Sequence, residues 1–202
     1  MVITRLEKNR SKNYSVYVDD KIAFEITEYA LFKLDVHIGK ELNEKELDLI
    51  RNQVLISIAQ NDAISFVSYK MRTTHEVELK LKEKYAIEII EEVVDYLNQN
   101  GYLNDEIYAE KFIIEKKRLE KLSKKVLMYK LLGKGISKSI IEEKISQLEY
   151  DESEYAKKLV SKFSKAIKEK EPFKTEGYLY RKGFSKDTIK SVIKEETNQD
   201  GD

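Results

Sequence analysis

Apolar and polar residues alternate in the first part of the chain and follow a helical period after it. The alternation runs through residues 14–18 and again through residues 22–26, on either side of the turn Asp19-Asp20-Lys21. Since successive side chains of a strand point to opposite faces, these two segments predict a β-hairpin. Residues 2–6 supply a further predicted strand, separated from the hairpin by the polar loop 9–13.

The pattern changes to that of helices beyond the hairpin. A short helix is predicted near residues 28–35, and a turn is predicted at Gly39. Asn43 has the side chain of a helix N-cap, and two glutamates in the next turn favour a helix start there. The apolar face predicted for this longer helix consists of Leu47, Ile50, Val54 and Ile58.

A pattern of about fifty residues then occurs three times. Each copy has an alanine on a first helix, a leucine on a second, an apolar or aromatic residue at the next joint, and an isoleucine five positions later. The aligned sets are Ala63, Ala109 and Ala156; Leu81, Leu131 and Leu179; Tyr85, Ile136 and Phe184; and Ile90, Ile141 and Ile189. A fixed period of this length is typical of stacked units that cannot bury their apolar faces alone.

These observations predict a mainly α fold, in which a small N-terminal β-strand/helix segment precedes a tandem array of three three-helix repeats. The predicted boundaries are 1–60 for the N-terminal segment, 61–104, 105–150 and 151–197 for the repeats, and 198–202 for a disordered tail. Such arrays usually present extended surfaces to partners, so the fold favours a binding function over catalysis.

Local signals place the ends of several helices. Thr73 and Glu76 have the spacing of a capping box, and Asp105 and Asp151 stand where N-caps are expected. Pro172 suits the first turn of a helix, where its missing N–H has no consequence. Gly101 is expected to end a helix in a left-handed conformation, and Gly135 and Gly183 are expected at the joint between the second and third helices of their repeats.

Composition agrees with a soluble, cytoplasmic protein, and a monomer is expected because the array can satisfy its own core. The chain has 37 basic and 37 acidic side chains, no cysteine, and no apolar run long enough for a membrane span. The charges are segregated: residues 111–138 carry ten basic and two acidic side chains, and residues 73–110 carry three basic and ten acidic ones. A basic segment beside an acidic one suits a polyanion or a charged protein groove.

Residue patterns of catalysis are missing from the sequence. His37 and His75 lie in different segments, and neither belongs to a ligand or catalytic pattern. The segment Gly133-Lys134-Gly135 lies between predicted helices and is interpreted as a helix end, not a phosphate loop. No enzyme activity, metal or cofactor is therefore expected.

Three segments resemble elements of the RecX family, the bacterial regulators of RecA recombinase. RTTHEVELKL at 72–81 is similar to R-[ST]-x-x-E-[LV]-x-x-K-L, LNQNGYLNDEIYA at 97–109 resembles a signature G-[YF]-[LI]-[DN]-D-x-x-[FY]-A, and LLGKGI at 131–136 resembles L-x-x-K-G-[IV]. Their order and spacing agree with the family, and the resemblance covers roughly residues 60–195. The N-terminal strands are similar to the extension of Gram-positive members. The first repeat departs from the pattern, because Lys84 is followed directly by Tyr85 without the glycine.

The resemblance implies an inhibitor of RecA that lies in the groove of the RecA–single-stranded DNA filament. Such a protein limits filament extension, ATP hydrolysis, strand exchange and co-protease activity, and thereby recombination, DNA repair and the SOS response. Direct contact with single-stranded or duplex DNA is a further expectation of this resemblance.

Charge density, rather than the resemblance, selects a candidate interaction surface for filament or DNA. It lies where the first helix of the second repeat ends and the next begins, with secondary positions at related joints. The candidate residues are Arg72, Lys116, Lys117, Arg118, Lys121, Lys124, Lys125, Arg181 and Lys182. The alternative interpretation is that these cations only solvate helix ends.

Two other functions are compatible with the same sequence. Short helices joined by glycine turns also resemble a helix-turn-helix DNA-binding regulator. Against it, the segment Ile140-Ile141-Glu142-Glu143 is acidic where a recognition helix should be basic. A generic helical-repeat scaffold for an unrelated protein partner is the second alternative.

Overall fold

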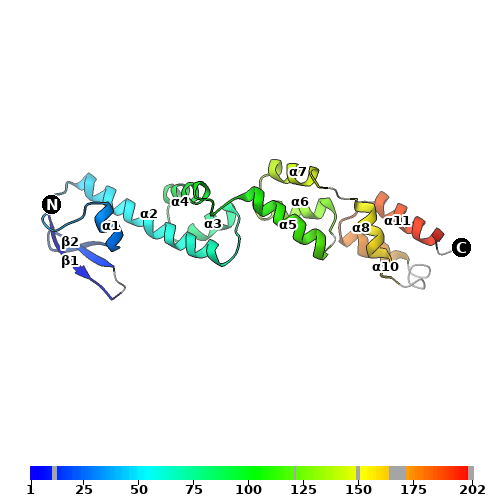
Figure 1. The fold of residues 1–202 in the computed structure, drawn as a ribbon, viewed down its shortest axis with the longest axis horizontal. Coiled ribbons are helices and arrows are strands. Elements are labelled where there is room, and N and C mark those ends of the chain that lie inside the picture. The colour runs from blue at the N-terminus through cyan, green and yellow to red at the C-terminus, as the bar shows by residue number, and fades with distance from the viewer. Residues whose placement is uncertain (11–12, 121, 149–150, 164–171, 200–202) are drawn as a thin grey trace. The chain divides into compact units, whose positions relative to one another are not determined.

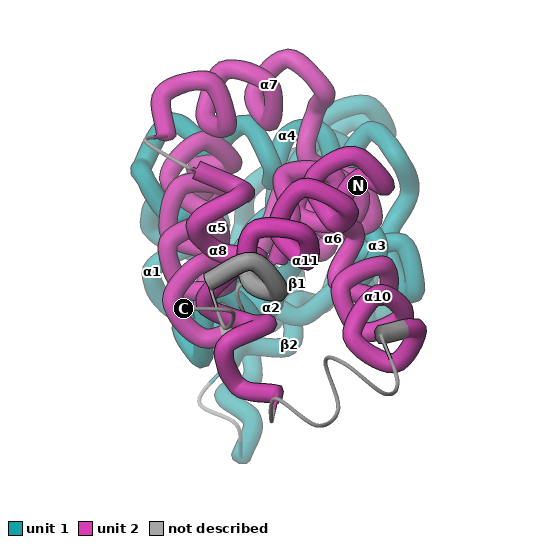
Figure 2. The backbone as a smooth tube through the Cα atoms, turned by 90° about the vertical axis from the view of Figure 1, so that its right-hand side faces the viewer, with its two compact units in different colours: residues 1–70, 78–102 teal, residues 71–77, 103–202 magenta. Residues whose placement is uncertain are grey.

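The structure of the chain is a computed structural model, shown in Figure 1. It describes residues 1–10, 13–120, 122–148, 151–163 and 172–199. These fall into two compact units, coloured separately in Figure 2. Unit 1 comprises residues 1–70 and 78–102, and unit 2 comprises residues 71–77 and those from 103 onward.

Unit 1 begins with an antiparallel sheet of strand order β1-β2-β3. The strands are β1 (Ile3–Lys8), β2 (Tyr14–Val18) and β3 (Lys21–Ile26). Asp19 and Asp20 join β2 to β3 with φ angles of 47° and 63°. Two consecutive left-handed residues match the right-handed twist of a hairpin, and aspartate tolerates that conformation. The predicted hairpin is confirmed.

Helices α1 (Glu28–Lys33) and α2 (Glu44–Tyr69) follow the sheet. Asn43 Oδ1 accepts from the Glu46 amide at 2.9 Å, and Glu46 Oε2 accepts from the Asn43 amide at 2.8 Å. This reciprocal capping box confirms the predicted start of α2. The sheet, α1 and the first half of α2 enclose a core that includes Ile3, Val16, Ile26, Leu47, Ile50 and Val54.

Helix α2 serves two cores in succession, which the sequence did not indicate. Its first half packs on the sheet, and its second half packs on α4 (Ile87–Gln99) with Ala59 and Ala63 fully buried. Ile58, predicted on the buried face, is instead 44% exposed because the buried stripe turns around the helix between the two cores. The boundary predicted between residues 60 and 61 consequently falls inside α2.

The rest of the described chain is helical, which confirms a mainly α fold with a small N-terminal sheet. The remaining described helices are α3 (Thr74–Leu81), α5 (Asp105–Glu120), α6 (Lys124–Leu132), α7 (Lys138–Ser146), α8 (Glu152–Val160), α10 (Pro172–Arg181) and α11 (Lys186–Gln199). Pro172 opens α10, as predicted. Helix α11 extends two residues into the predicted tail, and residues 200–202 lie outside the described residues. Within the described chain, no helix has the length and hydropathy of a membrane span.

Residues aligned by the fifty-residue pattern occupy equivalent buried places. The three alanines are fully buried, and Leu81, Leu131 and Leu179 are at most 2% exposed. Helices α5, α6 and α7 surround one core, and α8, α10 and α11 surround another. At the joint position Ile136 and Phe184 are buried, whereas Tyr85 is half-buried and donates its hydroxyl to Asp62 at 3.0 Å.

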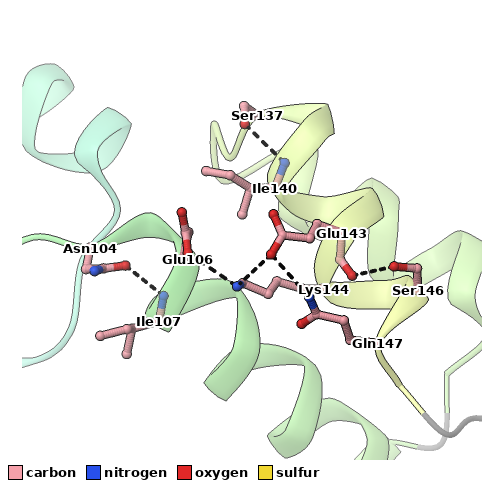
Figure 3. Close-up of polar contacts among 9 residues, drawn as sticks. All are labelled: Asn104, Glu106, Ile107, Ser137, Ile140, Glu143, Lys144, Ser146 and Gln147. Atoms are coloured by element: carbon pink, nitrogen blue, oxygen red, sulfur yellow. Dashed lines mark hydrogen bonds and ion pairs between the residues drawn. The ribbon is translucent and has the colours of Figure 1, made fainter.

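Among helices α5, α6 and α7, a lysine side chain joins α7 to α5 and an asparagine side chain caps α5, as Figure 3 shows. Lys144 of α7 reaches Glu106 of α5 and its own neighbour Glu143, each at 3.3 Å. Asn104 Oδ1 accepts from the Ile107 amide at 2.9 Å, so Asn104 is the N-cap of α5. The prediction that Asp105 caps this helix is wrong: its carboxylate accepts from the Thr74 amide instead. Asp151 does cap α8 as predicted.

Candidate interaction surface

The Lys134-Gly135 joint between α6 and α7 packs on the start of α3 within unit 2. Thr73 is fully buried and donates its hydroxyl to the Lys134 carbonyl at 2.8 Å. Gly135 has a φ of 77°, and a Cβ built on it would lie 2.3 Å from the Cβ of His75. Gly135 therefore lies at a helix end, as predicted, its conformation is left-handed, and its missing side chain is what permits the close approach.

An ion pair reinforces this joint. Lys134 Nζ lies 2.6 Å from Glu76 Oε1, while Glu76 Oε2 accepts from the Thr73 amide at 3.2 Å and completes the predicted capping box. Burial by itself would raise the pKa of Glu76, but the hydrogen bonds from Lys134 and Thr73 and the charges of Lys134 and Arg72 lower it below its ordinary value of 4.5. The hydrogen bond to Glu76 raises the pKa of Lys134.

We expect the Glu76→Gln variant to lose about 1 kcal/mol of unfolding free energy at pH 7, since a half-buried charged hydrogen bond is replaced by a neutral one. A depressed folded pKa stabilises the protein above the unfolded pKa, and that contribution disappears as pH falls through the folded value. The difference between wild type and variant should therefore shrink from pH 6 to pH 3, measured by urea unfolding. Glu91→Gln on the exposed face of α4 is the control. A difference independent of pH would contradict the role of the ion pair.

The Lys182-Gly183 joint between α10 and α11 repeats this geometry on the start of α6. The Ser123 amide donates to the Lys182 carbonyl at 3.2 Å, and Ser123 is fully buried. Gly183 has a φ of 85°, and its Cβ would lie 2.2 Å from Val126 Cγ2. The Lys124 amide also donates to Glu152 at the start of α8, at 2.6 Å. We call this meeting of α6, α8 and the second joint the C-terminal junction.

The C-terminal junction brings together predicted cations from three separate segments. Lys124 follows Ser123 directly, and Lys182 lies at the hydrogen-bonded joint, with its Nζ 5.8 Å from the centroid of the Tyr178 ring. Lys117, near the end of α5, lies 5.7 Å from the ring centroid of Tyr155 on α8. A cation over an aromatic face is held by the ring quadrupole while its ammonium stays near the surface.

The other predicted residues lie in different settings. Lys116 is half-buried beside Phe112 and Glu115, whereas Arg118, Lys125 and Arg181 are exposed. Arg72 lies at the first joint, near Glu76 and Lys134. Lys121 lies outside the described residues. The structure thus groups Lys117, Lys124 and Lys182, and it places Arg72 at another site.

Lys158 belongs to this cluster and was not predicted. Its Nζ lies 5.6 Å from the Tyr155 ring centroid and also pairs with Glu154. The two lysines on one tyrosine come from different helices, so only the packing of α5 near α8 reveals the arrangement. The spacing of Tyr155 and Lys158, one helical turn, was the available signal.

Among the described residues, no three His, Asp or Glu side chains are placed to hold a metal ion together. His37 pairs with its neighbour Asp35 at 3.4 Å, and His75 packs against Gly135.

Comparisons with known proteins agree on one family. Residues 59–97 match the family model for the first three-helix domain of RecX, and residues 104–145 match that for its second. Regulatory protein RecX of Clostridioides difficile is 31% identical over 98% of this chain and 97% of its own, and that of Bacillus subtilis is 31% identical over 93% and 73%.

Two solved structures show the same resemblance in three dimensions. A crystal structure of regulatory protein RecX covers 95% of this chain and 98% of its own, with a TM-score of 0.74 at 26% identity. RecX from Lactobacillus salivarius covers 69% of this chain and 95% of its own, with a TM-score of 0.58 at 31% identity.

Proposed function

Because this chain belongs to the RecX family of regulatory proteins, we propose that it regulates RecA by binding RecA assembled on single-stranded DNA. Bound there, it limits filament extension, and with it ATP hydrolysis, strand exchange and co-protease activity. The proposed state is a cytoplasmic monomer that needs no cofactor.

The C-terminal junction is the observation that carries this proposal. Lys117 and Lys158 lie at the ring of Tyr155, Lys182 lies at the ring of Tyr178, and the backbone amide of Lys124 is bonded to Glu152 at the start of the helix that carries Tyr155. Backbone hydrogen bonds to Ser123 and Lys124 hold these elements together, so the charges are placed by the fold rather than scattered. A fixed cationic cluster suits a polyanionic partner such as the DNA phosphates of a nucleoprotein filament.

Titration into RecA hydrolysing ATP on single-stranded DNA tests the proposal. We expect suppression of the steady-state rate at well below one copy per RecA, because a protein that blocks filament extension acts on many downstream subunits. A stoichiometric excess without effect would contradict the proposal. If such a protein still bound duplex DNA in a sequence-specific manner, a helix-turn-helix regulator would take its place.

A further inference from the structure

A groove with one aromatic wall lies between α10 and α11 of unit 2. Its cavity volume is about 500 Å³, and α10 contributes one wall while the start of α11 contributes the other. The lining residues are Phe173, Glu176, Gly177, Tyr180, Lys186, Ile189 and Lys190. Ile189 belongs to the buried core, so the groove reaches down to the core surface.

The aromatic wall consists of two large side chains of α10 that the fold leaves exposed to solvent. Phe173 is 66% exposed and Tyr180 is 64% exposed. They are seven positions apart, which is about two helical turns, so both project from the same face of α10. Leu81, Leu131 and Leu179 align the equivalent helices of the three repeats. At the positions that match Phe173 and Tyr180, the first repeat has His75 and Lys82, and the second has Lys125 and Leu132. The aromatic pair is particular to the third repeat.

Gly177 lies between Phe173 and Tyr180 on α10 and lines the same groove. It lies in the middle of α10 with ordinary helical φ, and a Cβ there would meet only the guanidinium of Arg181, at 3.5 Å. Neither backbone strain nor packing therefore calls for glycine. A mid-helix glycine costs about 0.5–1 kcal/mol relative to alanine. Its structural effect at this place is an open groove.

Charge decides what kind of ligand the groove suits. Residues 173–194 carry six basic and two acidic side chains. Lys186 and Lys190 line the groove, and across the described residues neither forms an ion pair with a carboxylate. Arg181 adds a further exposed cation beside Gly177. Exposed aromatic faces bordered by cations fit unpaired bases with their phosphates, since every base offers a stacking face.

We propose that this groove binds single-stranded nucleic acid directly, with bases stacked on Phe173 and Tyr180 and phosphates on Lys186, Lys190 and Arg181. A duplex keeps its bases stacked within itself, so the site discriminates in favour of single strands. The inference deepens the proposed function, because it assigns direct contact with single-stranded nucleic acid to one groove of the third repeat, and this contact requires no RecA.

Fluorescence anisotropy of a labelled oligothymidine with the full chain tests the groove. Phe173→Ala and Tyr180→Ala are each expected to weaken binding roughly tenfold, within the range for loss of one stacked base. Tyr180→Phe should retain affinity, because stacking needs the ring and not the hydroxyl. Gly177→Leu should weaken binding by filling the groove while favouring the helix. Lys186→Glu with Lys190→Glu should also reduce the salt dependence of binding.

The control pair is Tyr29→Ala with Phe32→Ala, aromatic residues on α1 of unit 1 that are 73% and 90% exposed. These should leave oligothymidine affinity within twofold. Unchanged binding by a folded Phe173→Ala/Tyr180→Ala variant would overturn the site, as would equal affinity for a duplex of the same length. The oligothymidine assay contains no RecA. If the wild-type chain failed to suppress RecA in the separate ATP hydrolysis assay, that result would therefore count against the proposed function alone.

Discussion

Replacement of Gly183 by alanine is expected to destabilise the protein by about 3 kcal/mol, and replacement of Gly135 by a similar amount. A residue with a Cβ loses about 1–2 kcal/mol in the left-handed conformation. The new methyl group would also overlap Val126 in one case and His75 in the other, at 2.2 and 2.3 Å. Relieving such an overlap in a packed region costs about 1–3 kcal/mol more. Urea unfolding followed by circular dichroism measures the loss.

Gly101→Ala is the matched control for both variants. Gly101 has a φ of 73°, and no atom lies within 4 Å of where its Cβ would be. It therefore carries the conformational penalty without the overlap, and a loss of about 1 kcal/mol is expected. Equal losses for Gly101→Ala and Gly183→Ala would show that the joints tolerate a side chain and that their close packing contributes little.

The comparison of these glycines shows what the sequence could and could not predict. A glycine after a run of helical residues predicts a left-handed helix end, and all three positions have that conformation. Nothing local distinguishes Gly183 from Gly101, because the difference is the presence of Ser123 and Val126, about sixty residues away in the chain. The helix end at each glycine could be predicted from the local sequence, whereas the packing of one repeat on the next could not.

The same distinction applies to the two wrong helix details. Asn104 and Asp105 are both good N-cap residues, and the choice between them depended on Asp105 being taken by the Thr74 amide of a distant segment. The exposure of Ile58 follows from α2 passing from one core to another, whereas a single helical period assumes one buried face.

Part of the candidate surface was predictable because charge density is a property of the sequence. Lys117 and Lys124 belong to the basic segment 111–138 and reach the C-terminal junction. Lys158 was missed because its charge matters only through Tyr155, which it shares with Lys117. The groove beside Gly177 was missed because a helical glycine gives no sign of what flanks it.

Reversing four charges of the predicted surface is expected to weaken binding to the RecA–single-stranded DNA filament about 100-fold. The variant carries Lys116→Glu, Lys117→Glu, Lys124→Glu and Lys125→Glu. Exposed charge pairs contribute up to about 1 kcal/mol each, so four together approach the roughly 3 kcal/mol that corresponds to 100-fold. Affinity measured at several salt concentrations should also show a shallower slope, because fewer counterions are released.

The control variant reverses four exposed lysines of unit 1, at Lys21, Lys33, Lys45 and Lys82. It changes the net charge by the same amount, so a loss confined to the first variant assigns binding to the surface and not to total charge. The structure also ranks the four: the side chain of Lys116 is only 22% exposed and pairs with Glu115, so Lys116→Glu alone should have the smallest effect. Equal losses in both four-fold variants would leave only general electrostatic attraction, and the cations at the C-terminal junction would then act as solvated helix ends.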